Sequence, residues 1–247
     1  MYRRSVLVIR ANDRFSDLLR ESGFDVLNLE LIKTEPIADQ SDLSVTVGRI
    51  SEYDGILITS PVAAKVLASE ISRSGSSFSG RVYVLGERAR SSLEPGGFDI
   101  AYDRDANTAE DLIRSFGDQE FEGKRLLFVR GDRSVGTVTS LLGKIAKVDE
   151  VIVYHTVEST PDDGVLGEAR TRMRSSEFRY VCFFSPSGVD SFTRLFSDLD
   201  YKLPAAAIGR TTARRAETAG FIVDYVSERA TAEDFAAGLA AHIKEIE

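Results

Sequence analysis

Residues 205–221 read AAAIGRTTARRAETAGF, and this pattern predicts a short apolar strand, a glycine turn at Gly209 and a helix that Gly220 closes. Two hydroxyls, Thr211 and Thr212, stand where the helix should begin. Glycine lets a ligand approach the backbone closely, and the first N–H groups of a helix have no partner inside it. The stretch therefore predicts an anion site above a strand end. The alternative is an ordinary strand–helix connection in which threonine caps the helix.

A second copy of this pattern lies 123 positions earlier, where Gly86 falls on Gly209. The copy spans residues 82–116 and corresponds to residues 205–239, and its run TAED at residues 108–111 falls on the same four letters at residues 231–234. Self-similarity at a fixed shift is the signature of an internal duplication. The 247 residues are therefore expected to form two similar domains rather than one large one.

The composition is typical of a globular protein, with 43% hydrophobic and 28% charged residues. No apolar run approaches the roughly 20 residues of a membrane span, and the N-terminus MYRRSVLVIR is too poor in apolar residues for a signal peptide. We therefore expect a cytoplasmic protein that does not bind membranes. The net charge of −8 argues against a nucleic-acid partner, because such binding depends on clustered Lys and Arg.

The sequence offers little for metal or redox chemistry. Its one cysteine, Cys182, lies in an apolar run, which favours a packing role. The two histidines, His155 and His242, stand far apart and near no cysteine. Neither a metal site nor a cofactor is expected.

Predicted strands alternate with helices in each half, which is the pattern of a doubly wound, flavodoxin-like parallel sheet in an α/β protein. Ligands of such sheets bind outside the carboxyl ends of the strands. The predicted substrate-binding residues are those in the turns that follow strands: Arg10, Thr59, Ser60, Gly86, Arg130, Gly131, Ser185, Ser187, Gly188, Gly209, Thr211 and Thr212. Ser60 and Ser185 each precede a proline, so helix capping is the alternative for both.

The order and spacing of these motifs resemble uroporphyrinogen-III synthase along the whole chain. The likeness rests on Arg10 after the first strand, Tyr53-Asp54 before a strand that ends in Thr-Ser-Pro, the turn at Gly86, VYHT at residues 153–156, FSPSG at 184–188, IGRTTA at 208–213, and the helix that Thr231 opens. Each motif is short, but the full set in this order is specific.

The resemblance implies two α/β domains that a two-stranded connector joins. One domain would comprise residues 1–32 with 160–247, the other residues 38–153, and the connectors residues 33–37 and 154–159. Sequence periodicity alone would divide the chain near residue 120 and would end a strand at residue 153. Both connectors have the extended composition that such a crossover needs.

The family closes the linear tetrapyrrole hydroxymethylbilane into uroporphyrinogen III, with loss of water and inversion of the last pyrrole ring. The resemblance thus implies a hydro-lyase of porphyrin, haem, sirohaem or cobalamin biosynthesis that needs no cofactor. Its substrate would be a polycarboxylate tetrapyrrole, and its candidate transient partner would be hydroxymethylbilane synthase. Helix N-termini and glycine turns at strand ends are a physical means to hold carboxylates.

The resemblance also assigns roles to single residues. Tyr154 matches the family's cleft tyrosine, which is proposed to help the hydroxyl group leave. Thr211 and Thr212 match its substrate-binding threonines, and the serine turns match those that face the substrate. The turn at Gly86 continues Glu-Arg-Ala-Arg and lacks the Thr-Ala of the family pattern. This departure weakens the case for substrate contacts there.

Two other classes share part of this pattern. A two-domain binding protein for a small anionic metabolite would have the same strand-end turns, but it would not need Tyr154 and would usually carry an export signal. A flavin or nucleotide protein would need a phosphate loop after the first strand. Arg-Ala-Asn-Asp at residues 10–13 has no glycine, and neither GxGxxG nor a Walker A pattern occurs.

Overall fold

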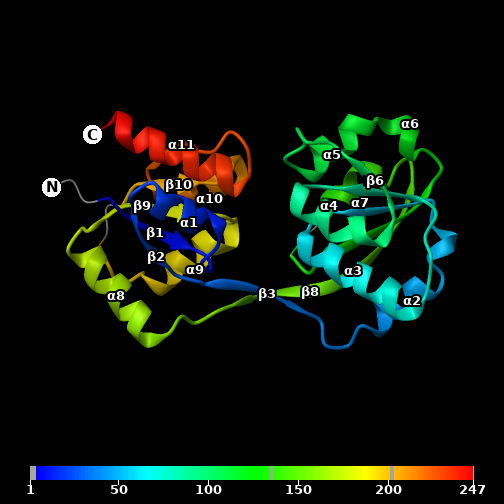
Figure 1. The fold of residues 1–247 in the computed structure, drawn as a ribbon, viewed down its shortest axis with the longest axis horizontal. Coiled ribbons are helices and arrows are strands. Elements are labelled where there is room, and N and C mark those ends of the chain that lie inside the picture. Colours follow the sequence, from blue (N-terminus) through cyan, green and yellow to red (C-terminus); the bar gives the residue numbers. More distant parts are fainter. Residues whose placement is uncertain (1–3, 134–135, 201–202, 247) are drawn as a thin grey trace. The chain divides into compact units, whose positions relative to one another are not determined.

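The computed structural model describes residues 4–133, 136–200 and 203–246. The chain divides into two compact units (Figure 1). Unit 1 comprises Met1–Lys33 and Glu158–Glu247, and unit 2 comprises Thr34–Val157. The chain thus leaves unit 1 after its first β-α-β segment, forms unit 2, and then returns to complete unit 1.

Unit 1 contains a five-stranded parallel sheet in the order β11-β10-β9-β1-β2. The strands are β1 (Ser5–Ile9), β2 (Asp25–Asn28), β9 (Phe178–Phe183), β10 (Ala205–Ala207) and β11 (Val223–Val226). The helices are α1 (Arg14–Glu21), α8 (Asp163–Arg174), α9 (Pro186–Leu195), α10 (Arg210–Thr218) and α11 (Ala232–Glu245).

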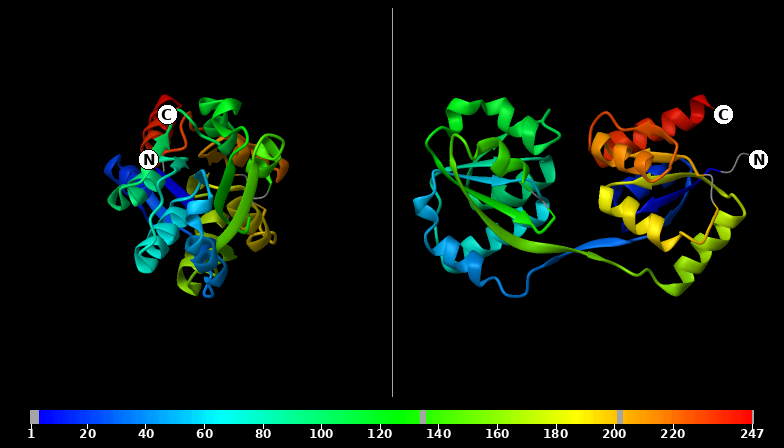
Figure 2. Two further views of the ribbon diagram at one scale, coloured as in Figure 1. Left: turned by 90° about the vertical axis from the view of Figure 1, so that its right-hand side faces the viewer. Right: turned by 180° about the vertical axis from the view of Figure 1, so that it is seen from behind.

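Helices cover both faces of this sheet (Figure 2). Leu7 of β1 packs into a core that α8, α9 and α10 complete, whereas Val6 and Val8 pack into a core with α1 and α11. Burial on both faces explains why β1 is a continuous apolar run rather than an alternating one.

Unit 2 contains a six-stranded sheet in the order β3-β8-β7-β4-β5-β6. Its strands are β3 (Ile32–Pro36), β4 (Gly55–Ile58), β5 (Arg81–Val84), β6 (Asp99–Tyr102), β7 (Arg125–Gly131) and β8 (Lys147–Glu158). The helices are α2 (Ser41–Gly48), α3 (Pro61–Ser74), α4 (Glu87–Leu93), α5 (Ala109–Phe116), α6 (Asp118–Phe121) and α7 (Thr137–Leu142), with 3₁₀ turns η1 (Ile50–Glu52) and η2 (Glu94–Gly96). Two cores, one with α2, α3 and α4 and one with α5, α6 and α7, again cover the two faces.

The predicted connectors are strands of this sheet. The sequence predicts a strand that ends at residue 153 and a separate connector over residues 154–159, but β8 runs without a break from Lys147 to Glu158. β3 pairs with the far part of β8: the Ile37 N–H donates to the Val153 carbonyl (3.1 Å), and the Ser159 N–H donates to the Leu31 carbonyl (2.9 Å). The residue number falls from 37 to 31 on β3 while it rises from 153 to 159 on β8, so the two strands are antiparallel.

The duplication is visible in the strand order. Reading outward from the centre of each sheet, β9-β10-β11 of unit 1 correspond to β4-β5-β6 of unit 2, and β1-β2 correspond to β7-β8. The predicted α/β class with two parallel-rich sheets is therefore confirmed. β3 is the addition that gives unit 2 its sixth strand.

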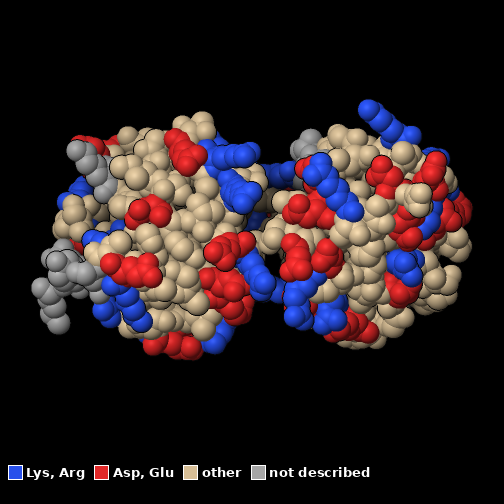
Figure 3. Space-filling view, turned by 90° about the horizontal axis from the view of Figure 1, so that it is seen from above, with Lys and Arg blue, Asp and Glu red and all other residues tan. Residues whose placement is uncertain are grey.

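The surface carries charges of both signs. In the view of Figure 3, Lys and Arg are interspersed with Asp and Glu over each unit. None of the helices among the described residues has the length and apolar character of a membrane span.

Candidate functional site

The carboxyl ends of β1, β9 and β10 lie at one edge of the sheet of unit 1, because these strands are parallel. Ile9 pairs with Phe183, and Phe183 pairs with Ala207, so Arg10, Phe184 and Ile208 follow at the same level. We call Arg10 and residues 184–188 and 208–212 the unit 1 rim. It brings together seven of the predicted binding residues: Arg10, Ser185, Ser187, Gly188, Gly209, Thr211 and Thr212.

Arg10 is held by its neighbours on this rim. Its guanidinium lies over the Phe184 ring (4.2 Å from the centroid) and pairs with Asp13 (2.9 Å). Asp13 in turn caps α1 by accepting from the Phe15 N–H (3.1 Å). A guanidinium has five N–H donors, so the pairing with Asp13 does not by itself exclude a second carboxylate.

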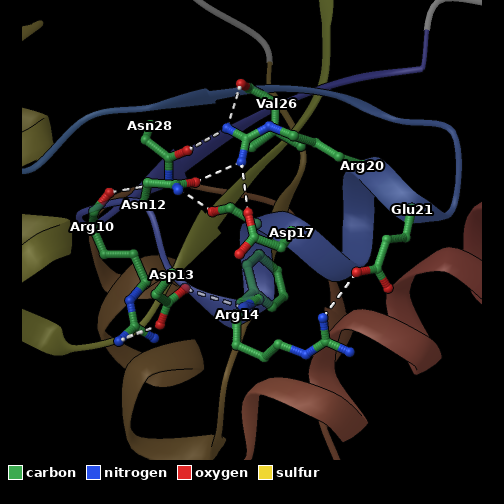
Figure 4. A network of polar contacts seen from close by, with 11 residues as sticks. Arg10, Asn12, Asp13, Arg14, Asp17, Arg20, Glu21, Val26 and Asn28 are labelled. Atoms are coloured by element: carbon green, nitrogen blue, oxygen red, sulfur yellow. Dashed lines mark hydrogen bonds and ion pairs between the residues drawn. The ribbon is translucent and has the colours of Figure 1, made fainter.

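A polar network fixes the backbone next to Arg10 (Figure 4). The Asn28 amide at the end of β2 donates to the Arg10 carbonyl (3.3 Å) and to the Ser16 hydroxyl (2.7 Å). Arg20 of α1 donates to the Asn28 amide oxygen (2.9 Å) and to Asn12 (2.5 Å). The ends of β1 and β2 are therefore joined through side chains that the sequence did not single out.

The two Ser-Pro turns act as helix caps. Ser185 begins α9 by accepting from the Gly188 N–H (3.1 Å), and Ser60 begins α3 by accepting from the Val62 N–H (3.2 Å). The capping alternative is confirmed for both serines. The Ser187 hydroxyl lies 3.1 Å from that of Ser185 and completes a hydroxyl pair on the unit 1 rim.

The turn before α10 contradicts the alternative in which a threonine caps the helix. The N-cap is Gly209, in an extended conformation (φ −176°), and no side chain caps the helix. Thr211 is exposed, whereas Thr212 is only 4% exposed. Without a side-chain cap, the first N–H groups of α10 point out of the helix end, where a carboxylate can accept from them.

The unit 2 rim comprises residues 59–60, 130–132 and 154–156 with Gly86, at the carboxyl ends of β4, β5 and β7 and the adjoining part of β8. Gly86 begins α4 in the left-handed region (φ +86°) that glycine favours. Glu87 follows in the first helical turn and pairs with Arg90 (2.8 Å), which lowers the pKa of Glu87. This helix end therefore already carries a carboxylate of the chain itself.

Arg130 is bound within unit 2. Its Nε donates to Glu150 (2.6 Å) and its Nη1 to the Gly131 carbonyl (2.9 Å), and its side chain is only 14% exposed. The Thr139 hydroxyl also donates to Glu150. These contacts account for the burial of Arg130 without a ligand.

Tyr154 lies directly against Gly131. The tyrosine is 8% exposed, and a Cβ at position 131 would lie 2.3 Å from its Cζ atom. Only glycine at position 131 leaves room for this ring. No hydrogen bond joins the Tyr154 phenol to any other residue among those described.

Asp132 is a polar residue of this rim that the sequence did not single out. Its carboxylate accepts from the Thr156 N–H (2.9 Å) and contacts the His155 ring (3.2 Å), while its own N–H donates to the Tyr154 carbonyl (3.1 Å). Partial burial raises the pKa of Asp132, but the Thr156 N–H and His155 outweigh it and lower the pKa below its usual value. The only hint of this role in the sequence is that Asp132 is a polar residue directly after a predicted strand.

Two hollows of unit 2 lie away from most predicted site residues. One of about 570 Å³ is lined by residues between Ile37 and Arg49 and by Glu150, Val151, Ile152 and His155 of β8. One of about 280 Å³ is lined by Pro36, Ile37, Gln40 and Leu43 and by residues of α3, Glu70 and Arg73 among them. Within the described ranges, no group of three or more His, Cys, Asp or Glu side chains is placed to hold a metal ion.

Comparison with known proteins gives one consistent result. Residues 13–237 match the family model described as uroporphyrinogen-III synthase HemD. The uroporphyrinogen-III synthase of Chlorobaculum parvum is 24% identical over 252 residues, which cover 98% of this chain and 100% of that protein.

Two solved structures share the fold. A mutant uroporphyrinogen III synthase from the extremely thermophilic bacterium Thermus thermophilus has a TM-score of 0.65 at 16% identity and covers 98% of this chain and 99% of its own. The uroporphyrinogen-III synthetase of Helicobacter pylori has a TM-score of 0.62 at 15% identity, with coverages of 97% and 99%. At such identities these structures establish the fold alone.

Proposed function

The chain belongs to the uroporphyrinogen-III synthase family, and from this premise we propose how its residues handle the substrate. It is a uroporphyrinogen-III synthase, a hydro-lyase of tetrapyrrole biosynthesis. The family implies hydroxymethylbilane as the substrate. The reaction breaks the C–O bond of the hydroxymethyl group, releases water and closes the ring with inversion of the last pyrrole.

In the proposed mechanism, the carboxylates of the substrate bind chiefly at the unit 1 rim. The N-terminus of α10 has no side-chain cap, and the exposed Arg210 and Thr211 stand in its first turn. Backbone N–H groups, the positive end of the helix dipole and a guanidinium all favour a carboxylate. Ser187 adds a hydroxyl just beyond the end of β9, the strand that pairs with β10.

The unit 2 rim supplies the proton donor. We assign to Tyr154 the donation of its phenolic proton to the hydroxyl group that leaves as water. Its ring is fixed against Gly131, and its phenol makes no hydrogen bond to the other described residues. A phenol held in this way is a general acid that costs little reorganisation. The observation that carries the proposal is this close fit of Tyr154 and Gly131 in a chain whose residues 13–237 match the family model.

The test is an isomer-resolved assay. Purified protein is incubated with freshly prepared hydroxymethylbilane, and the I and III isomers of uroporphyrinogen are separated. We expect mainly the III isomer, because the substrate closes unaided to the I isomer. A product mixture equal to that of the unaided reaction would contradict the activity.

Hydroxymethylbilane synthase is the proposed protein partner, because a substrate that closes unaided is best transferred quickly. Sedimentation velocity of the two proteins together tests the contact. Boundaries that stay those of the separate proteins at micromolar concentration would contradict it.

A further inference from the structure

The strand that carries Tyr154 contains a β-bulge. Arg130 of β7 pairs with Ile152 of β8, but the next residue, Gly131, pairs with Tyr154, so Val153 is an extra residue. Val153 and Tyr154 are consequently buried in the same core, although neighbours in a regular strand point to opposite faces. The bulge is therefore what turns the Tyr154 ring toward Gly131.

A bulge also disrupts the hydrogen bonds of its ladder and bends the strand. Beyond the bulge of β8, the bonds from the β7 side come from Asp132. The Asp132 N–H donates to the Tyr154 carbonyl (3.1 Å), and its carboxylate accepts from the Thr156 N–H (2.9 Å). One residue thus extends the contacts of β7 with β8 past their last ladder pair, Gly131 with Tyr154, and does so on both sides of His155.

The contact with His155 completes the set. Its Nδ1 lies 3.2 Å from the second carboxylate oxygen of Asp132, although the His155 side chain is 52% exposed. Asp132 thereby contacts three consecutive residues of β8. Hydrogen bonds to an ionised carboxylate are stronger than those between neutral groups, so this one side chain can hold a bent strand in place.

We propose that Asp132 is a positioning residue for Tyr154: by holding residues 154–156 it keeps the phenol fixed against Gly131. The inference rests on the proton-donor role of Tyr154. Asp132 itself acts through the strand and does not donate a proton.

A double-mutant cycle tests this directly. Asp132→Ala is expected to lower kcat about tenfold and to leave KM nearly unchanged, as the loss of a charge-assisted hydrogen bond does. Asp132→Asn should restore most of the rate, because its amide oxygen can still accept from the Thr156 N–H. In a Tyr154→Phe background, Asp132→Ala should have no further effect on kcat.

The controls separate positioning from simple loss of structure. His155→Ala removes only the side-chain contact and should lower kcat less than about twofold, and the folded fraction of each variant is measured by circular dichroism. An equal loss from Asp132→Ala in both backgrounds, or a loss that only follows the folded fraction, would overturn the inference while Tyr154 keeps its role. Full activity of Tyr154→Phe would overturn the role of Tyr154 itself and this inference with it.

Discussion

Gly86 of unit 2 and Gly209 of unit 1 occupy the same place in the duplicated chain, yet they begin their helices differently. Gly86 takes the left-handed conformation (φ +86°) and is followed by Glu87. Gly209 is extended (φ −176°) and is followed by Arg210. The shared glycine marks a shared connection, whereas the residue after it sets the sign of charge at the helix end.

The corresponding strand pairs, β1–β2 in unit 1 and β7–β8 in unit 2, also differ in the side chain that joins their ends. In unit 1 the outer strand reaches inward, because Asn28 of β2 donates to the carbonyl of Arg10. In unit 2 the residue after the inner strand reaches outward, because Asp132 accepts from Thr156 on β8. The duplicated frame thus carries two unlike rims, and we assign carboxylate binding chiefly to unit 1 and proton donation to unit 2.

Tyr154→Phe should produce the largest effect and tests the assignment of chemistry to unit 2. We expect kcat to fall about 100-fold, the low end of the range for general acid catalysis, because the hydroxyl group leaves readily even in water. KM should change little. The matched control is Tyr102→Phe on β6 of the same unit, which should leave both constants unchanged. Isomer-resolved steady-state kinetics measures both variants, and equal activity of the two would remove Tyr154 from the chemistry.

Gly131→Ala should come next and has a matched partner in unit 1. A Cβ at position 131 would lie 2.3 Å from the Tyr154 ring, whereas one at Gly188 would lie 3.3 Å from the Ser185 hydroxyl. Overpacking at Gly131 should cost about 1–3 kcal/mol of stability and should lower kcat by displacing Tyr154. Gly188→Ala should be close to neutral, because alanine also favours the helix. Thermal unfolding and kcat of both variants measure this, and a fully active, equally stable Gly131→Ala would refute the steric argument.

Local sequence is enough to predict the features that depend on a few neighbouring residues. Ser60 and Ser185 cap helices because a serine before a proline suits that position. The parallel sheets follow from apolar runs that alternate with helices. The helix start at residues 211–212 is less well determined locally, since Gly209 and not a threonine is the cap.

Contacts between residues far apart in the chain determine the features that local sequence patterns do not predict. Residues 154–158 resemble a connector, because Tyr-His-Thr interrupts the apolar run, yet β3 pairs with them and extends β8. The role of Asp132 depends on the bulge at Val153, and Arg20 meets Asn28 only once β2 lies beside α1. No spacing within the chain encodes these contacts directly.

Reversing the charge of the residue that follows each glycine turn, Arg210 or Glu87, should have a smaller effect on catalysis. Arg210→Glu gives α10 the acidic first turn of α4, and we expect KM to rise about five- to tenfold, because a carboxylate there repels the substrate and removes a cation. The converse change, Glu87→Arg, should alter KM less than twofold if unit 1 binds most carboxylates. Initial rates over a range of substrate concentrations decide between them, and a larger effect at Glu87 would reverse the assignment of the rims.

The smallest effect should come from removing a carboxylate at the edge of each sheet that lies opposite its rim. Each unit has a Tyr–Asp contact there, whose contribution to stability depends on pH. Tyr180 donates to Asp224 in unit 1, and His242 lies 3.3 Å away; the hydrogen bond from Tyr180 contributes most to a lowered pKa of Asp224. In unit 2, burial raises the pKa of Asp149, but Arg125 (2.8 Å) and Tyr53 (3.2 Å) outweigh it and lower the pKa.

A carboxyl group with a lowered pKa stabilises the fold above its unfolded value of about 4, and this contribution disappears as the pH falls through the folded value. At pH 7 we therefore expect Asp149→Asn and Asp224→Asn each to lower Tm by at most about 4 °C, since both pairs are partly exposed. Asp149→Asn should have the larger effect, because Arg125 donates through both Nε and Nη2. Melting curves between pH 7 and pH 3 should show the difference from the unaltered protein closing below about pH 4. A difference that stays constant down to pH 3 would mean that these substitutions act through packing and not through the charge.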